Sequence, residues 1–70
     1  MQHSSDDARW IKQQLERIPP RYRQQAMDGY SDAYQSAYDA EPVGHKKENA
    51  ARFAANTRLR KFIDKVLALR

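Results

Sequence analysis

The sequence predicts an all-α protein, a three-helix bundle in which one short N-terminal helix packs on a hairpin of two long helices. Three observations favour this fold. The 70 residues include two glycines and few β-branched residues, whereas Ala, Gln, Arg and Lys, which favour helices, are frequent. Apolar residues recur at steps of three and four, the spacing of one helix face. Proline-containing turns separate one short segment from two long ones.

The first helix is expected to begin near Ser4 or Ser5, either of which is able to cap it. Asp6 and Asp7 then lie close to the positive N-terminal end of the helix. Proline disfavours helical geometry in the preceding residue, so the helix is expected to end before the Pro-Pro pair at residues 19–20. One apolar stripe continues over about three turns. It comprises Ala8, Ile11, Leu15 and Ile18.

The second helix is expected from about Pro20 to about Ala40, with Pro20 as its first residue. Its apolar residues form two adjacent rows that cover about half the circumference, an arc suited to two neighbouring helices. Tyrosines in one row are expected to bury their rings and keep their hydroxyls in water. Asp28, Asp32 and Asp39 gather on the remaining side as an acidic face. The rows are Tyr22, Ala26, Gly29, Ala33 and Ala37, and Met27, Tyr30, Tyr34 and Tyr38.

A third helix is expected from about His45 to near Arg70, after a turn at residues 41–44. Short connections make consecutive helices neighbours, which completes the bundle. We expect one helical domain over residues 1–70, with residues 1–4 disordered. The apolar arc of this helix comprises Ala51, Ala55, Leu59, Phe62, Val66 and Leu69, widened by Ile63 and Leu67.

Composition excludes several classes of protein. The chain has no cysteine, so it has neither a disulfide scaffold nor a thiolate metal cage. No apolar run approaches the roughly 20 residues needed to span a bilayer. The first residues lack the basic and apolar regions of a signal peptide. These features predict a cytoplasmic protein with no membrane partner.

Catalytic and metal-binding patterns are also missing from the sequence. There is no glycine-rich phosphate loop. His3 and His45 have no second ligand at metal-binding spacing, and no serine has a nearby activating His or Lys. Asp28 and Asp32 are four residues apart and are interpreted as solvated charges. We therefore expect no enzymatic activity, no metal, no cofactor and no small-molecule substrate.

Charge is concentrated in the C-terminal part of the sequence. The chain has 13 Lys and Arg against 9 Asp and Glu, a net charge of +4. Residues 1–40 have five basic and six acidic side chains, whereas residues 41–70 have eight and three. Lys47, Arg58, Lys61 and Lys65 fall on one side of the third predicted helix. Such a stripe suits nucleic-acid phosphates, and it is also compatible with a solvated face or with an internal match to the acidic face of the second helix.

A second polar patch follows the same helix at Asn49, Arg52, Asn56 and Arg60, beside Phe53. Asn and Arg are suited to bidentate contacts with base edges, and an exposed Phe53 suits stacking on a base or contact with a protein. Ordinary surface residues, and a Phe53 covered by the first helix or by the chain ends, are the alternatives. The predicted nucleic-acid contacts are Lys47, Arg52, Asn56, Arg58, Arg60, Lys61 and Lys65.

The aromatic residues support a second hypothesis, a protein-interaction module. Trp10 lies off the first apolar stripe, and the chain has more aromatic surface than so small a bundle buries easily. The partner would be another protein, with the chain acting as an adaptor or an enzyme inhibitor, or a second copy in a homodimer. The predicted protein contacts are Trp10, Phe53, Tyr34 and Tyr38.

Five stretches beyond the first predicted helix form one pattern. They are Ile18-Pro19-Pro20, Gly29-Tyr30-Ser31, Ala37-Tyr38-Asp39-Ala40-Glu41-Pro42, Glu48-Asn49-Ala50-Ala51-Arg52 and Ala55-Asn56-Thr57-Arg58-Leu59-Arg60. This pattern resembles a family of short proteins encoded by phages and prophages of enteric bacteria. The resemblance implies a small cytoplasmic accessory protein that acts on host or phage machinery by binding, and it assigns a role to no residue. A protein partner would then be a host or phage protein, with the chain acting as an adaptor or an inhibitor of a host enzyme.

Overall fold

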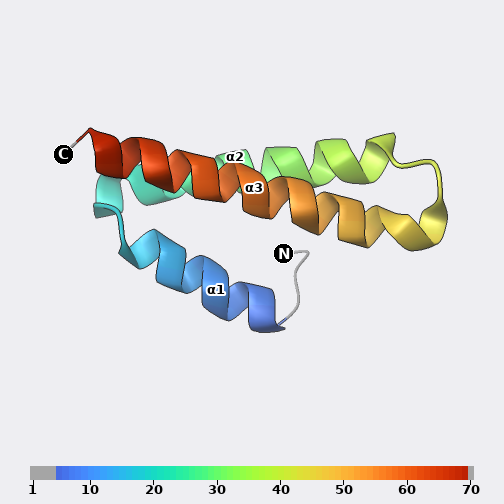
Figure 1. Cartoon of the computed structure of the whole chain (residues 1–70), viewed down its shortest axis with the longest axis horizontal. Coiled ribbons are helices and arrows are strands. Elements are labelled where there is room, and N and C mark those ends of the chain that lie inside the picture. Colours follow the sequence, from blue (N-terminus) through green and yellow to red (C-terminus); the bar gives the residue numbers. More distant parts are fainter. Residues whose placement is uncertain (1–4, 70) are drawn as a thin grey trace.

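Three α-helices follow one another along the chain: α1 (Ser5–Glu16), α2 (Pro20–Ala40) and α3 (Lys47–Ala68), with a 3₁₀ turn η1 (Gly44–Lys46) before α3 (Figure 1). The computed structural model describes residues 5–69, and the side chains of residues 7–69. The predicted three-helix bundle is confirmed.

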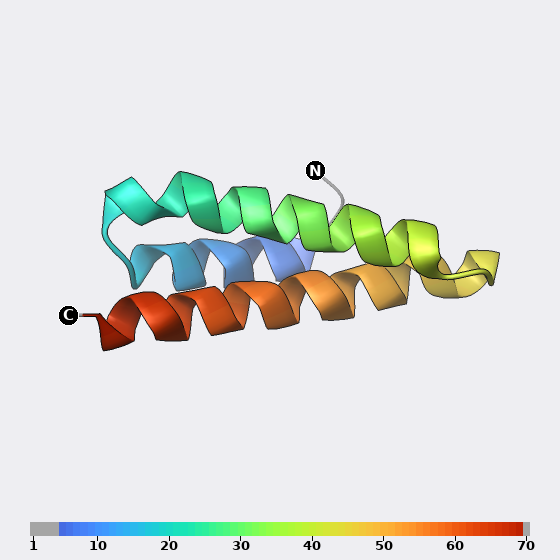
Figure 2. The same ribbon diagram turned by 90° about the horizontal axis from the view of Figure 1, so that it is seen from above.

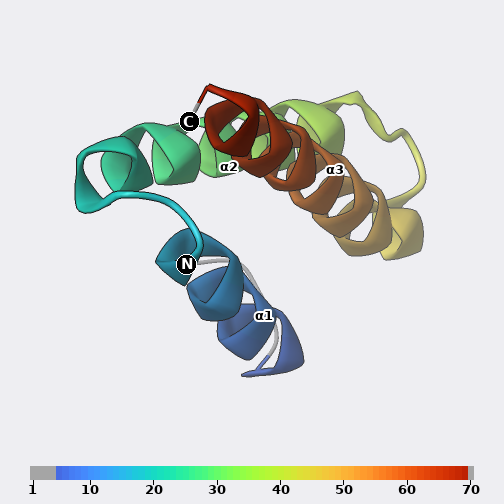
Figure 3. The ribbon, with the colours of Figure 1, turned by 60° about the vertical axis from the view of Figure 1, so that its left-hand side comes forward.

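The two long helices form an antiparallel hairpin, and α1 runs back along one half of it (Figure 2). The hairpin contacts are extensive, whereas α1 packs less extensively against both long helices. Figure 3 shows α1 on one side of the hairpin. The molecule measures 41 × 21 × 15 Å. Because α1 covers only one half of the hairpin, a cross-section through that half contains three helices and a cross-section through the other half contains two.

Both ends of α2 are held by basic side chains from neighbouring elements. Arg23 Nε donates to the carbonyl oxygen of Leu15 (2.8 Å), which ties the first turn of α2 to the end of α1. At the other end, Lys47 Nζ donates to the carbonyl oxygens of Tyr38 (3.0 Å) and Glu41. The last carbonyls of a helix have no partner within the helix and favour a nearby cation. Lys47 therefore caps α2 and joins it to α3.

The core changes character along the bundle. In the half with three helices it is filled mainly by aliphatic side chains, whereas in the half with two helices tyrosine rings lie beside alanines. The rings of Tyr30 and Tyr34 stack with centroids 6.5 Å apart, and those of Tyr34 and Tyr38 with centroids 6.3 Å apart. The buried apolar residues are Ile11, Ile18, Ala26, Tyr30, Tyr34, Ala51, Ala55, Leu59, Ile63 and Val66.

Two details of the core prediction are wrong. Leu69 was predicted in the core and is 69% exposed, because α3 ends at Ala68. The hydroxyl of Tyr30 is buried and makes no hydrogen bond, whereas it was expected in water.

The predicted helix boundaries hold best for α2, whose bounds match the prediction. The first helix ends two residues before Ile18, and the third begins at Lys47 because residues 44–46 form the 3₁₀ turn. The predicted Ser4 cap, the disorder of residues 1–4 and a helix end at Arg70 lie outside the described residues. Within residues 5–69, no helix has both the length and the apolar character needed to cross a membrane.

Candidate nucleic-acid interface

The hairpin brings basic residues from distant parts of the sequence to one end of the bundle. Gly29 of α2 lies opposite Arg58 of α3, near the middle of both helices. On one side of this level lie α1, the first turns of α2 and the last turns of α3 (Figures 1 and 2). We call residues 8–27 and 58–69 the basic half, and residues 7 and 28–57 the acidic half.

The two halves differ sharply in charge. The basic half has nine Lys and Arg side chains against Glu16 and Asp64, whereas the acidic half has three Lys and Arg against six Asp and Glu. All the basic side chains of the basic half except Arg23 are exposed. They are Arg9, Lys12, Arg17, Arg21, Arg23, Arg58, Arg60, Lys61 and Lys65. The exposed cations of this half therefore come from all three helices rather than from α3 alone.

The four residues of the stripe predicted on α3 differ in their surroundings: two are open to solvent, and two are directed at α2. Lys61 and Lys65 are exposed, and neither forms an ion pair within the described part of the chain. Lys47 is occupied as the cap of α2, and its ammonium lies 5.4 Å from the ring centroid of Tyr38. Arg58 is exposed but turns toward α2. Only Lys61 and Lys65 therefore match the predicted free stripe.

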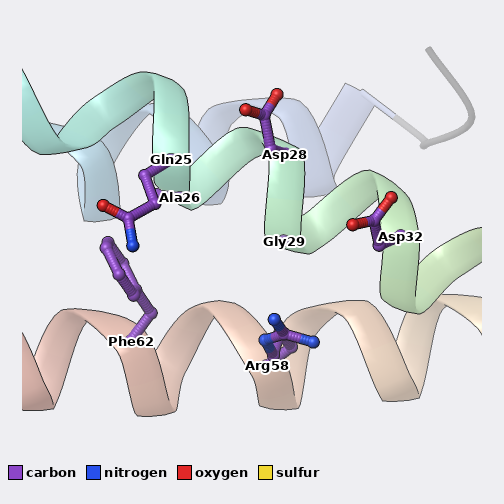
Figure 4. Close-up of a pocket in the computed structure, with 7 residues that line it drawn as sticks. All are labelled: Gln25, Ala26, Asp28, Gly29, Asp32, Arg58 and Phe62. Carbon is purple, nitrogen blue, oxygen red and sulfur yellow. The ribbon is translucent and has the colours of Figure 1, made fainter.

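Arg58 lies in a cleft of about 220 Å³ between α2 and α3. Figure 4 shows Arg58 and Phe62 pointing from α3 toward α2, whereas Asp28 and Asp32 point away from α3. The guanidinium therefore faces α2 without an ion pair to its acidic side, among the described residues. The volume is below the roughly 300–1,000 Å³ typical of small-molecule sites. The lining residues are Gln25, Ala26, Asp28, Gly29, Asp32, Arg58 and Phe62.

The predicted Asn/Arg patch holds α1 in place. Arg52 forms a bidentate ion pair with Asp7, with Nε–Oδ2 at 2.6 Å and Nη2–Oδ1 at 3.1 Å. Hydrogen bonding to Asp7 raises the pKa of Arg52. The side-chain oxygen of Asn56 is buried, and the guanidinium of Arg60 lies 5.3 Å from the ring centroid of Trp10. Arg52 and Asn56 therefore do not form the open base-reading surface that the sequence suggested.

Asp7 is the structural residue that sequence reasoning missed, because it was interpreted only as a charge near the helix N-terminus. It is 8% exposed and lies near the buried tyrosines. Burial and the charge of Asp7 raise the pKa of Tyr30, and burial is the largest cause of the raised pKa of Tyr34. The available signal was spacing: Asp7 is four residues before Ile11 and so shares its buried face.

The aromatic residues proposed as protein contacts have different surroundings. Tyr34 is only 7% exposed, so the expectation of an available ring is wrong there. Tyr38 is 40% exposed and lies beside the ammonium of Lys47. Trp10 is partly buried against the core. Phe53 is 75% exposed, so neither α1 nor any other described residue covers it.

Neither a metal centre nor a known relative assigns a more specific activity. Among the described residues, no three side chains of His, Cys, Asp or Glu are placed to share a metal ion. No family model, curated protein or solved structure matches the chain. The function has to be inferred from the residues and their placement.

Proposed function

We propose that this chain is a non-enzymatic accessory protein that binds nucleic acid through its basic half. The main supporting observation is that the basic half contains nine of the twelve Lys and Arg of residues 7–69, and that eight of the nine are exposed. Cations gathered in this way neutralise phosphates and release their counterions, which gives affinity independent of sequence. The phage and prophage proteins that the chain resembles make an accessory role the expected context.

The acidic half determines which end of the bundle faces the nucleic acid. It has twice as many Asp and Glu as Lys and Arg. Two of its three cations already have partners, because Lys47 caps α2 and Arg52 pairs with Asp7. A polyanion is therefore attracted to one end of the bundle and repelled from the other, and the turn between α2 and α3 points away from it.

A protein partner is less well supported by the same surface. Three of the four aromatic candidates pack within the chain: Tyr34 is buried, Tyr38 lies beside Lys47, and Trp10 lies beside Arg60. Of the four, only Phe53, at 75%, and Tyr38, at 40%, are exposed. Two rings on different helices are a narrow basis for a protein interface, which normally centres on a cluster of buried anchors.

The test is fluorescence anisotropy with a labelled oligonucleotide in low salt, using Lys65→Glu and a matched control, Lys46→Glu. Both lysines are exposed, and they lie in opposite halves of the bundle. We expect Lys65→Glu to weaken binding about tenfold. The slope of the logarithm of affinity against the logarithm of salt concentration should fall by about the contribution of one phosphate contact. Lys46→Glu should change the affinity less than about twofold, since a distant charge is screened.

Far-UV circular dichroism checks that both variants keep their helices. Absence of binding at tens of micromolar wild-type protein in low salt would overturn the proposal. So would equal weakening by Lys46→Glu and Lys65→Glu, because charge anywhere on the molecule would then suffice.

A further inference from the structure

We infer that the nucleic acid bound at the basic half is single-stranded, with one of its bases stacked on Phe53. This inference rests on the proposed function and defines its substrate more closely. Among the residues whose side chains the structure describes, Phe53 is the most exposed large hydrophobic one, at 75%. Its neighbours one helical turn away include the small Ala50 and Thr57, so the ring is open to a flat ligand.

The position of Phe53 relative to the cations points to an anionic ligand. Arg60 is seven residues after Phe53, so both side chains lie on the same face of α3, about 10 Å apart along its axis. The guanidinium of Arg60 in turn lies over the ring of Trp10, at 5.3 Å from its centroid. An aromatic ring, a cation and a second aromatic ring therefore follow one another from the edge of the acidic half into the basic half.

This combination suits a single strand better than a duplex. Stacking on an aromatic side chain requires an open base face, and in a duplex these faces are covered by neighbouring base pairs. A basic surface combined with exposed aromatic rings is the usual arrangement for single-strand binding without sequence preference. Arg60 and Lys61 would hold the backbone while Phe53 receives the base, so phosphate and base contacts lie about two turns apart on one helix.

The experiment compares three labelled ligands of one sequence: single-stranded DNA, single-stranded RNA and duplex DNA. Wild type is compared with Phe53→Ala, Phe53→Leu and Phe53→Tyr. We expect Phe53→Ala and Phe53→Leu to weaken single-strand binding about tenfold and to leave duplex binding unchanged. Phe53→Tyr should retain wild-type affinity because it keeps the flat ring. Leu tests whether apolar area alone is sufficient, and the DNA and RNA arms separate the two kinds of strand.

Unchanged single-strand affinity in Phe53→Ala would overturn this inference, as would a wild-type preference for duplex. If Lys65→Glu still weakens binding in that case, the proposed function stands and only the stacking contact fails. Wild-type single-strand affinity in Phe53→Leu would also overturn stacking. It would show that an apolar side chain without a ring is sufficient at this position, as in a protein interface. Phe53 is exposed, so these variants should unfold at the same temperature as wild type.

Discussion

The basic and acidic halves of the bundle use the same residue types for different purposes. In the acidic half, Lys47 caps a helix and Arg52 holds α1 through Asp7, so these cations stabilise the fold. In the basic half, Arg23 likewise binds a backbone carbonyl, whereas Lys61 and Lys65 are exposed and form no ion pair within the described part of the chain. A count of Lys and Arg therefore does not by itself identify a binding surface. A cation is available to a ligand only where the fold provides no carbonyl or carboxylate to bind it.

Packing differs between the halves as well. The basic half is closed by three helices around Ile11, Ile63 and other aliphatic residues. In the acidic half, the rings of Tyr30 and Tyr34 fill a space between two helices where alanine allows close approach. The free energy of unfolding should therefore depend on aliphatic volume in the basic half and on the state of the tyrosine hydroxyls in the acidic half.

The largest effect should come from removing aliphatic volume in the basic half. Ile63→Ala deletes part of a side chain that is fully buried, at 0% exposure. We expect the free energy of unfolding to fall by about 2–5 kcal/mol, because transfer and cavity terms add. Urea unfolding measures the change. Leu69→Ala is the control, since Leu69 is 69% exposed and should cost less than about 0.5 kcal/mol. Similar costs for both variants would contradict the assigned core.

A smaller and more local effect is expected from Arg52→Met. The substitution keeps most of the side-chain length but removes the guanidinium that pairs with Asp7. We expect faster amide hydrogen exchange in residues 8–16, with little change in the hairpin, because α1 packs less extensively than α2 and α3 do. Arg58→Met is the control, because Arg58 forms no ion pair with any described residue. Unchanged exchange in α1 would show that the ion pair does not hold it.

The smallest effect concerns alkaline pH. Burial and the charge of Asp7 raise the pKa of Tyr30 above its ordinary value of 10.0. The unfolded chain therefore loses this proton at lower pH than the folded chain, so stability is lost as the pH rises above about 10. Tyr30→Phe removes this ionisation and a buried hydroxyl that makes no hydrogen bond. We expect unchanged or slightly higher stability at pH 7 and a reduced alkaline loss, measured by urea unfolding. An alkaline loss equal to that of wild type would contradict the assignment.

The sequence predicted the helices because their signals are local. Pro20 and the change of pattern after Ala40 define α2, and steps of three and four identify Ala51, Ala55 and Leu59 as core. Leu69 followed the same period and is exposed, because a period says which face a residue shares and not where the neighbouring helix ends.

The candidate site was less predictable because it depends on contacts between distant residues. Arg52 and Asp7 are 45 residues apart in sequence, so no local pattern links them. The division at residue 40 placed the excess charge in the C-terminal part, whereas folding brings α1 and the first turns of α2, with their basic residues, to the same half of the bundle as the last turns of α3. The helical spacing identified Phe53 as a candidate, but whether it is exposed could be decided only from the position of α1 in the fold.

The most direct test of binding through the basic half is NMR chemical-shift mapping of the intact chain during titration with an oligonucleotide in low salt. We predict that the largest amide shifts fall within residues 8–27 and 58–69 and beside Phe53, with small changes around the α2–α3 turn. Shifts concentrated between residues 36 and 50, or no shifts at saturating oligonucleotide, would contradict this account.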